Sequence, residues 1–576
     1  MSIATHYNYP ASSIGASSTT RTSPTAVSPS STSPGSNAMS LDQRPYAELD
    51  RPYVKVVKDE DEKRPGDLEF SDQSDCDEQE VVPAATPLNG SFVDLTQELK
   101  DTYGGDVPSA EATSPSSDAA SDRKRRARFG EDQRKETSET RNLGACMRCH
   151  NQRIRCVPNP LYPDQPCQTC VNVSMTNKKT IHNFPCLRDK VTSMTIYRAG
   201  NLRLTRRFSH TQVMDVGDNA DNVIRTVVMS QGLSKKPIIL QVRRFIPREG
   251  DVLNRRYIDN GVPKEERIAP FCLADVEKTA KGFQHYIREN ALDGLAEAAK
   301  GSDDLVQFTF AMIGQQCRRL FEMKDTSKKK NKEWDFLHQT VRLWFATRHG
   351  IGSAWLMGED TLGMELDEPK PNHPLDGRVS VPRMVVAQFD SIRHERIYKE
   401  LAPKVLRLFQ SFLGSGNLEA WFTVYLAAFL LLHQAACTSY DRRRYVKQNS
   451  GGMPQETRYG PRDHPLTKFV EEVQSSAGIL LAHWLYYRRV DVMSLDWKKQ
   501  DKSSLKHLEP YQAQFMKSTV DHLKRKMEAI PKEPRAGCWE DELCWIARMF
   551  DTVGLEEKWS PPESFTTAKP SVGRDW

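Results

Sequence analysis

Hydrophobic and polar positions follow a helical period through the last half of the chain. From about residue 271 onward, apolar residues recur at three- and four-residue intervals, and clusters of glycine and proline interrupt the pattern. The pattern predicts a large, mainly α-helical domain over residues 271–560. Its helices are expected over residues 274–295, 303–323, 331–347, 382–413, 418–448, 465–489, 504–530 and 539–555.

The most apolar stretch of this region is residues 420–432. These thirteen residues are fewer than the roughly 20 needed to cross a bilayer, so we expect a buried core helix and no membrane partner. His433 follows directly. A histidine in such a place is expected to be a structural group with its hydrogen bonds satisfied, and ligand binding is the alternative.

A different pattern precedes the helices. Short runs of β-branched residues bounded by glycine and proline predict strands over residues 194–204, 223–229 and 237–245, within a small β-rich segment at 196–270. Residues 187–218 contain no sustained apolar heptad, so no adjacent coiled coil is predicted and the oligomeric state stays open.

The first 120 residues show almost no apolar periodicity and are rich in serine, threonine and proline. Such a composition predicts a disordered arm, because too little apolar surface is available to offset the entropy of ordering. The arm is acidic, with 8 Lys and Arg against 20 Asp and Glu. Residues 91–99 set apolar side chains among acids, which is typical either of an activation segment that contacts co-regulators or of a solvated linker.

Half of the twelve cysteines lie within a stretch of 41 residues. Two Cys-x2-Cys pairs and two single cysteines offer six soft sulfur ligands, and two zinc ions can each reach four of them if two sulfurs are shared. Residues 1–10 have no apolar core typical of a secretory signal, so a disulfide framework is the less favoured alternative. The predicted metal ligands are Cys146, Cys149, Cys156, Cys167, Cys170 and Cys186.

This spacing resembles the binuclear zinc cluster (Zn2Cys6) family of fungal DNA-binding regulators, whose pattern is Cys-x2-Cys-x6-Cys, a loop, Cys-x2-Cys and a last Cys. The resemblance covers a module at residues 143–195 and implies two Zn2+ per chain. It implies that Cys146 and Cys167 bridge both ions. The last loop, of fifteen residues, is longer than usual, and His182 within it is an alternative to Cys186 as a ligand.

The resemblance also implies that the segment between the second and third cysteines enters the major groove of double-stranded DNA. Arg153 occupies the position of the family's base-reading lysine, and its guanidinium can pair with guanine O6 and N7. A structural zinc module that contacts only proteins is the alternative. The expected DNA-binding residues are Arg148, His150, Gln152, Arg153 and Arg155.

A dense cationic run lies in the basic segment at residues 121–142, just before the cysteines. Residues 121–190 together carry 15 Lys and Arg against 7 Asp and Glu, a balance of +8 that suits a nucleic-acid partner. The run is expected to be a nuclear-import signal, a phosphate-binding arm or both, with a merely solvated run as the alternative. Its residues are Arg123, Lys124, Arg125, Arg126 and Arg128.

Catalytic motifs are missing from the sequence. It contains no phosphate-cradling glycine loop, no Gly-x-Ser-x-Gly elbow and no His-Glu-x-x-His, and a zinc ion held by four sulfurs has no open position for water. The sequence therefore predicts a nuclear, multidomain transcription factor that is not an enzyme. The runner-up is a zinc-bearing interaction factor of a nuclear complex that does not read bases.

Overall fold

The computed structural model describes residues 130–162, 165–176, 186–365, 375, 377–416, 418–449, 457–497, 505–526 and 538–550. The predicted disordered arm, the cationic run at 123–128 and the alternative ligand His182 lie outside these residues.

Three helices carry the cysteine-rich segment. They are α1 (Glu131–Leu143), α2 (Met147–Asn151) and α3 (Gln168–Thr176). No side chain of α1 is buried, and this helix was not predicted because it has no apolar stripe to give a period. A short 3-10 helix, η2 (Val191–Ser193), follows.

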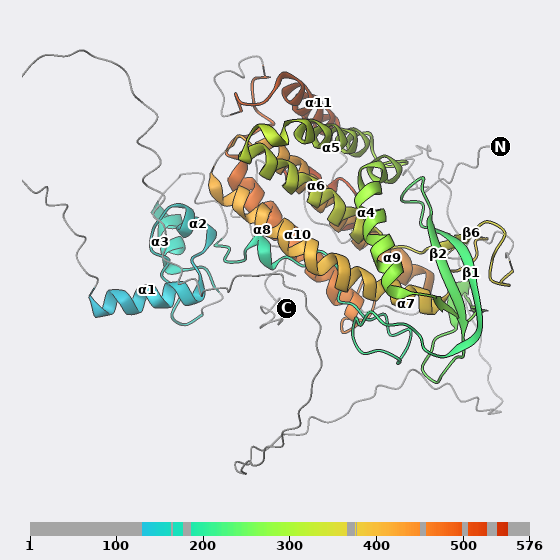
Figure 1. Ribbon diagram of the computed structural model, residues 1–576. Helices are drawn as coiled ribbons and strands as arrows, with labels where there is room; N and C mark the ends of the chain where they lie inside the picture. Colours follow the sequence, from blue (N-terminus) through green and yellow to red (C-terminus); the bar gives the residue numbers. More distant parts are fainter. Residues whose placement is uncertain are drawn as a thin grey trace, which may run out of the picture. The chain divides into compact units, whose positions relative to one another are not determined.

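A four-stranded antiparallel sheet comes next. It consists of β1 (Asn219–Ser230), β2 (Ile238–Phe245), β5 (Phe271–Leu273) and β6 (Trp355–Met357), in the order β5-β2-β1-β6. In β2 burial largely alternates, because successive side chains point to opposite faces. The buried face contributes Ile238, Leu240 and Val242 to the core, and Figure 1 shows α4 beside this sheet.

The strand predictions are partly confirmed. Two of the three predicted strands correspond to β1 and β2, whereas the strand predicted over residues 194–204 is wrong. That stretch runs as irregular chain against the helices, where Thr195 N–H donates to Ser476 Oγ at 2.8 Å. The hairpin of β3 (Asn254–Asp259) and β4 (Val262–Arg267) was missed, although Asn260-Gly261 at its turn, both with positive φ, is a hairpin signal.

The remaining elements are helical, as the apolar period predicts. The first group is α4 (Val276–Ala298), α5 (Asp304–Met323), η3 (Lys324–Thr326) and α6 (Lys328–Arg348). Each α-helix of this group begins at a side-chain cap, from Asp275, Asp303 and Ser327 respectively, which satisfies a backbone N–H of its first turn.

The helix predicted over residues 382–413 is interrupted. It consists of α7 (Arg383–Ile392), one π-helical turn η4 (Arg393–Tyr398) and α8 (Lys399–Ser415), which ends at the left-handed Gly416. The other helices are α9 (Trp421–Asn449), α10 (Pro465–Arg488), α11 (Pro510–Lys526), η6 (Cys538–Glu540) and α12 (Cys544–Arg548). The last predicted helix, at 539–555, is therefore much shorter among the described residues.

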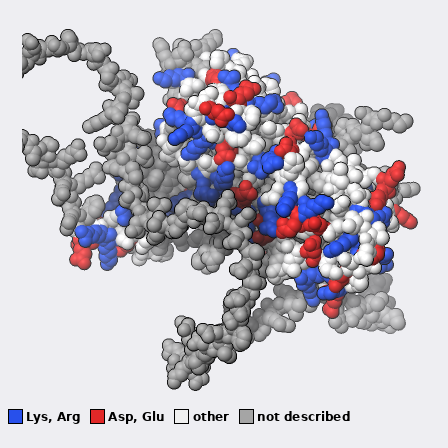
Figure 2. Space-filling view, in the orientation of Figure 1, with Lys and Arg blue, Asp and Glu red and all other residues white. Residues whose placement is uncertain are grey.

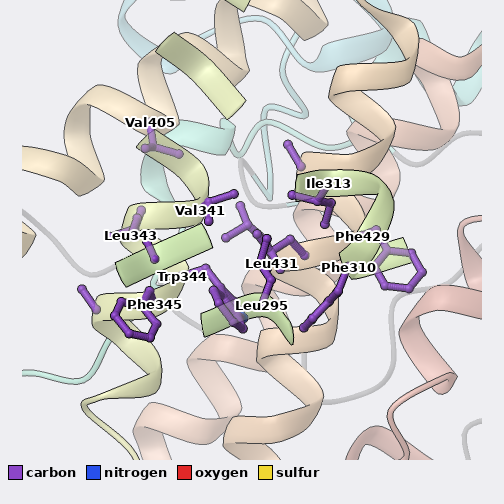
Figure 3. Packing of buried hydrophobic residues seen from close by; sticks show 14 of the residues in the cluster. Leu295, Phe310, Ile313, Val341, Leu343, Trp344, Phe345, Val405, Phe429 and Leu431 are labelled. Carbon is purple, nitrogen blue, oxygen red and sulfur yellow. The ribbon is translucent and has the colours of Figure 1, made fainter. Parts of the chain in front are cut away.

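Helix α9 is the centre of the core. Every side chain from Trp421 to Ser439 is buried, and α9 contacts α5, α6, α8, α10 and α12. By length and hydropathy it could cross a bilayer, yet its apolar window is 100% buried within the protein, as expected for a core helix. Figure 3 shows Phe429 and Leu431 among the aromatic and aliphatic side chains of neighbouring helices, such as Phe310 and Trp344.

Candidate metal centre

Both Cys-x2-Cys pairs begin a helix, and the first cysteine of each pair accepts a hydrogen bond there. The N–H of Cys149 donates to Cys146 Sγ at 3.4 Å, and the N–H of Cys170 donates to Cys167 Sγ at 3.3 Å. Each first cysteine therefore serves as a cap, and the helical turn brings the second sulfur of the pair beside the first. The spacing of two residues is what this local geometry requires.

The two pairs meet face to face. Cys146 Sγ lies 3.4 Å from Cys170 Sγ, and Cys149 Sγ lies 3.7 Å from Cys167 Sγ and 3.8 Å from Cys170 Sγ. All four sulfurs lie within 4.8 Å of one another and belong to buried residues. Four thiol ligands at such distances suit a tetrahedral ion bound at about 2.3 Å, so this cluster can hold a metal ion.

Each of the two single cysteines accepts a hydrogen bond from the backbone N–H of the first cysteine of a Cys-x2-Cys pair. The N–H of Cys146 donates to Cys156 Sγ at 3.5 Å, and the N–H of Cys167 donates to Cys186 Sγ at 3.2 Å. Cys156 also interacts with the thiol of Cys167, whereas Cys186 interacts with those of Cys146, Cys167 and Cys170. The structure therefore brings together all six predicted ligands, and Cys146 and Cys167 contact both single cysteines.

Hydrogen bonds between the thiols lower the pKa values of some cysteines and raise those of others. The hydrogen bond from Cys149 lowers the pKa of the Cys146 thiol to about 3, and a hydrogen bond donated by Cys146 lowers the pKa of Cys167. The pKa values of the Cys149, Cys170 and Cys186 thiols are raised, first because each donates to Cys146. Metal binding requires thiolates, so a bound cation would replace these remaining protons.

One arginine lies against the sulfurs. Arg188 Nη1 donates to the carbonyl of Gly144 at 2.9 Å and to Cys156 Sγ at 3.6 Å. Although burial opposes the charge, electrostatic interaction with Cys156 and Cys186 raises the pKa of Arg188. These contacts place positive charge beside a cluster that is negative when its thiols are ionised.

Arg148 departs from the expected DNA contact. Its side chain is only 2% exposed, and its Nη2 donates to the carbonyl of Cys170, which joins α2 to α3. A guanidinium held in this way is not available to a duplex, and it instead fixes one Cys-x2-Cys pair against the other. Sequence spacing did not indicate this, because helical position alone does not show which face of so short a helix is covered.

Arg153 lies at the end of α2 in an unusual backbone conformation. Its φ is +54°, in the left-handed region that favours glycine. Its N–H donates to the carbonyl of His150, and the N–H of Ile154 donates to that of Cys149, the paired hydrogen bonds of a Schellman helix end. The cap turns the chain away from the helix and leaves the Arg153 side chain exposed.

The other predicted DNA-binding residues surround this turn. His150 and Arg155 are exposed and Gln152 is half-buried. Arg155 Nη1 pairs with Glu136 Oε2 of α1 at 2.7 Å, and Thr140 Oγ1 of the same helix donates to the carbonyl of Cys156 at 3.5 Å. The apolar period gave no signal for Glu136 or Thr140, since α1 has no buried face.

Cysteines outside the cluster have no metal partners among the described residues. Cys272, Cys317, Cys437 and Cys544 are buried, as free thiols of a core are expected to be. His433 is a buried structural group, as predicted. It lies between Cys437, whose Sγ is 3.7 Å from Nδ1, and Glu542, whose Oε2 is 3.6 Å from Nε2.

Comparisons with known proteins place the C-terminal part of the chain. A family model described as KpeA transcription factor matches residues 197–549. A protein of Stachybotrys chartarum, the satratoxin biosynthesis SC3 cluster transcription factor SAT20, is 21% identical over 351 residues. That match covers 60% of this chain and 46% of the relative, so the chain spans about half of the relative's length. No solved structure matches.

The matched region begins after Cys186 and contains the four-stranded sheet and helices α4 to α12. The comparisons therefore identify a transcription regulator by its helical region and say nothing about the cysteine cluster. Because the family model covers more than half of the chain, the protein belongs to the KpeA transcription factor family.

Proposed function

We propose that this transcription regulator binds specific DNA sites through a module built on two zinc ions and six cysteines. The observation that carries the proposal is the sharing of contacts within the cluster. Cys167 contacts the thiols of both Cys156 and Cys186, and Cys146 contacts Cys186 through its thiol and Cys156 through its backbone N–H, so the two single cysteines share Cys146 and Cys167 as neighbours. One ion would take Cys146, Cys149, Cys156 and Cys167, and the other Cys146, Cys167, Cys170 and Cys186.

Zinc in such a site supplies structure, because four sulfurs fill its coordination shell and leave no position for water. The protein's own residues then determine what the module can contact. Arg148 positions α2 against α3, while the cap at the end of α2 presents Arg153 to solvent. An exposed arginine beside a short helix can offer its guanidinium to guanine in the major groove.

The remaining parts take supporting roles in this proposal. The cationic run at residues 123–128 contacts phosphates, directs the protein to the nucleus, or does both. The acidic arm at 1–120 contacts co-regulators, and the helical domain regulates the module.

Selection from random DNA duplexes with the full-length protein tests the base reading. An enriched motif is expected, and Arg153→Ala should relax the preference at one base pair at a cost of about 1–3 kcal/mol. Arg141→Ala, an exposed arginine of α1, serves as the matched control and should leave the motif unchanged. A uniform loss over all sequences would instead make Arg153 a phosphate contact.

The zinc count is tested separately by native mass spectrometry. Two ions per chain are expected, and Cys186→Ser should lose or weaken one of them. Two ions retained at full affinity in that variant would show that Cys186 is not the sixth ligand.

A second candidate function is favoured by the surroundings of Arg155. Its pairing with Glu136 places a carboxylate beside the segment that would face DNA, and such a charge repels phosphates. A zinc module that recognises a protein partner would accommodate this acid. Salt-sensitive DNA binding without an enriched motif would support this second function over the first.

A further inference from the structure

A cavity of about 890 Å3 lies within the family-matched region, far along the chain from the cysteines. Segments that are far apart in the sequence form its wall, and six of them contribute most of the lining residues. These are the loop at 198–204, strand β3, residues 349–354, the start of α7, the end of α9 and the start of α10. Its volume is that of a site for a small organic molecule.

The wall of the cavity is strongly cationic. Seven arginines line it against two carboxylates, those of Asp441 and Glu472. The arginines are Arg198, Arg203, Arg255, Arg256, Arg383, Arg393 and Arg444. Seven guanidinium groups around one cavity require nearby negative charge, because burying a cation that has no anionic partner costs free energy.

Part of that compensation is built into the fold. Arg198 pairs with the buried Asp390 of α7, and Arg393 Nη2 lies 3.5 Å from the same carboxylate. Arg444 Nη2 pairs with Asp441 Oδ1 at 2.8 Å. These three arginines are therefore structural parts of the wall.

Arg255 and Arg383 differ from them, because their hydrogen bonds in the described structure go to neutral groups. Arg255 donates to Ser380 Oγ at 2.9 Å and to Ser353 Oγ at 3.1 Å. Arg383 Nε donates to the carbonyl of Asn254 at 3.4 Å. Both side chains are partly buried, so two cations share one region of the wall without a paired carboxylate.

Electrostatics agree with this geometry. Burial, followed by the charge of Arg383, lowers the pKa of Arg255 to about 10, although Glu266 and Tyr445 act in the opposite direction. Burial likewise lowers the pKa of Arg383. A bound anion would remove this penalty by neutralising both guanidinium groups.

The wall is also partly apolar and locally strained. Phe283, Phe389 and Phe469 contribute rings beside the arginines. Asn201 and Arg203 border the cavity with φ of 72° and 54°, a conformation that costs non-glycine residues energy and is enriched at functional sites. The π-helical turn η4, another feature common at functional sites, begins at Arg393 of the wall.

We propose that this arginine cavity binds a small organic anion, with a carboxylate or phosphate head against Arg255 and Arg383 and an apolar body against the phenylalanines. The planar guanidinium fork matches both kinds of head group in two-pronged hydrogen bonds. Because the wall is made from segments far apart in the sequence, ligand binding there would be coupled to the packing of the helical domain. The inference is independent of the proposed DNA contact, since its test uses neither DNA nor zinc content.

The test uses the full-length protein and the fluorescent probe 8-anilinonaphthalene-1-sulfonate, whose sulfonate stands in for the anionic head. Arg255→Gln/Arg383→Gln should weaken its binding about tenfold or more, the equivalent of losing one charge-assisted contact. Arg318→Gln/Arg407→Gln, which changes the charge equally at exposed helix positions outside the cavity, should bind as the wild type does. N-phenyl-1-naphthylamine, which lacks the sulfonate, should bind both double variants alike.

Displacement of the probe then distinguishes the head groups. Benzoate or phenyl phosphate should displace it from the wild type, and whichever is the stronger competitor identifies the preferred head, whereas neutral benzamide should not compete. Displacement by a polyglutamate peptide and by neither small anion would overturn the proposal in favour of a peptide-binding site. Equal probe affinity in the wild type and the Arg255→Gln/Arg383→Gln variant would also overturn it.

Folding of the double variant is checked by its thermal transition. If that transition is lost, Arg203→Gln replaces it, because Arg203 is an exposed loop residue that lines the same cavity. This variant should bind the probe more weakly than the wild type. Unchanged affinity in it would count against the proposal.

Discussion

The cysteine module and the helical domain are ordered by different forces. Among the described residues of 130–176, the buried side chains are five cysteines, Met147 and Arg148. The helical domain instead buries a continuous cluster of aromatic and aliphatic side chains around α9. The helical domain thus depends on the removal of apolar surface from water, whereas the module has few apolar side chains and, in the proposed function, depends on ligands to zinc.

Surface charge adds to this contrast. On the face drawn in Figure 2, basic and acidic side chains are interspersed among uncharged ones. Inside the protein, Arg188 lies beside a sulfur of the module, whereas Arg198 and Arg393 pair with the buried carboxylate of Asp390 in the helical domain.

Metal removal should give the largest effect, and it should unfold the cysteine module while the helical domain stays folded. Excess chelator should unfold the cysteine module, because binding energies of about 10–16 kcal/mol are typical where structural zinc holds a small domain. All ten tryptophans lie after residue 330, so their fluorescence should not change. Limited proteolysis should then cut within residues 140–190. A module that resists protease without metal would contradict this expectation.

A substitution in the core of the helical domain should destabilise that domain and leave the cysteine module unchanged. Trp344 is 1% exposed and packs edge-to-face on Phe310. Trp344→Ala should destabilise the helical domain by about 3–5 kcal/mol, since it removes contacts and leaves a cavity. Thermal unfolding measures the loss, and the zinc content should equal that of the wild type. A fall in zinc content would mean that the two regions are coupled.

Acid should weaken the helical domain through His349, which is buried among Phe283, Tyr286 and Phe345. Burial, followed by Arg393 and Arg348, lowers the pKa of His349 to about 3. Between this value and the unfolded pKa of about 6.5, the unfolded state binds more protons, so stability falls as pH falls, by up to about 1.4 kcal/mol per pH unit.

His349→Gln tests this assignment, because glutamine stays neutral through the same range. Denaturant titrations from pH 7 to pH 4, followed by tryptophan fluorescence, should show a flatter loss of stability in the variant. The same slope in both proteins would assign the acid sensitivity to other groups.

The smallest effect is expected at Arg153, the proposed base-reading residue, whose backbone has a positive φ. Arg153→Gly should stabilise the metal-bound module by up to about 1 kcal/mol, because glycine adopts a positive φ without steric cost. Arg153→Ala keeps most of that cost and serves as the control. Zinc-competition titrations compare the two, and equal zinc affinities would show that the left-handed cap is not strained.

In each of the two regions, some features could be predicted from the sequence and others could not. The six cysteines were predicted as one site because Cys-x2-Cys is a local geometry, closed by a single helical turn. The helices were predicted from their apolar period, but the turn at residues 393–398 was not, since the buried pattern continues through the π-helix. The role of Arg148 depends on contacts across the module, and spacing does not encode those.

The arginine cavity was beyond sequence reasoning for the same reason. Arg255 and Arg383 are 128 positions apart, and each alone resembles an ordinary surface arginine of a strand or a helix start. Their proximity follows from the packing of β3 near α7, which no periodicity shows. The Asn260-Gly261 turn that joins β3 to β4 was the local signal that a hairpin stood there.

The complete enclosure of α9 has a consequence for how the protein is made. Two of the helices that cover it, α10 and α12, follow it in the chain, and α12 ends about a hundred residues after α9. At a synthesis rate of roughly 5–20 residues per second, the apolar surface of α9 emerges from the ribosome about 5–20 s before its cover is complete. During that interval the nascent chain exposes the apolar surface of α9, so we expect chaperones that shield this helix to raise the yield of folded protein in a cell.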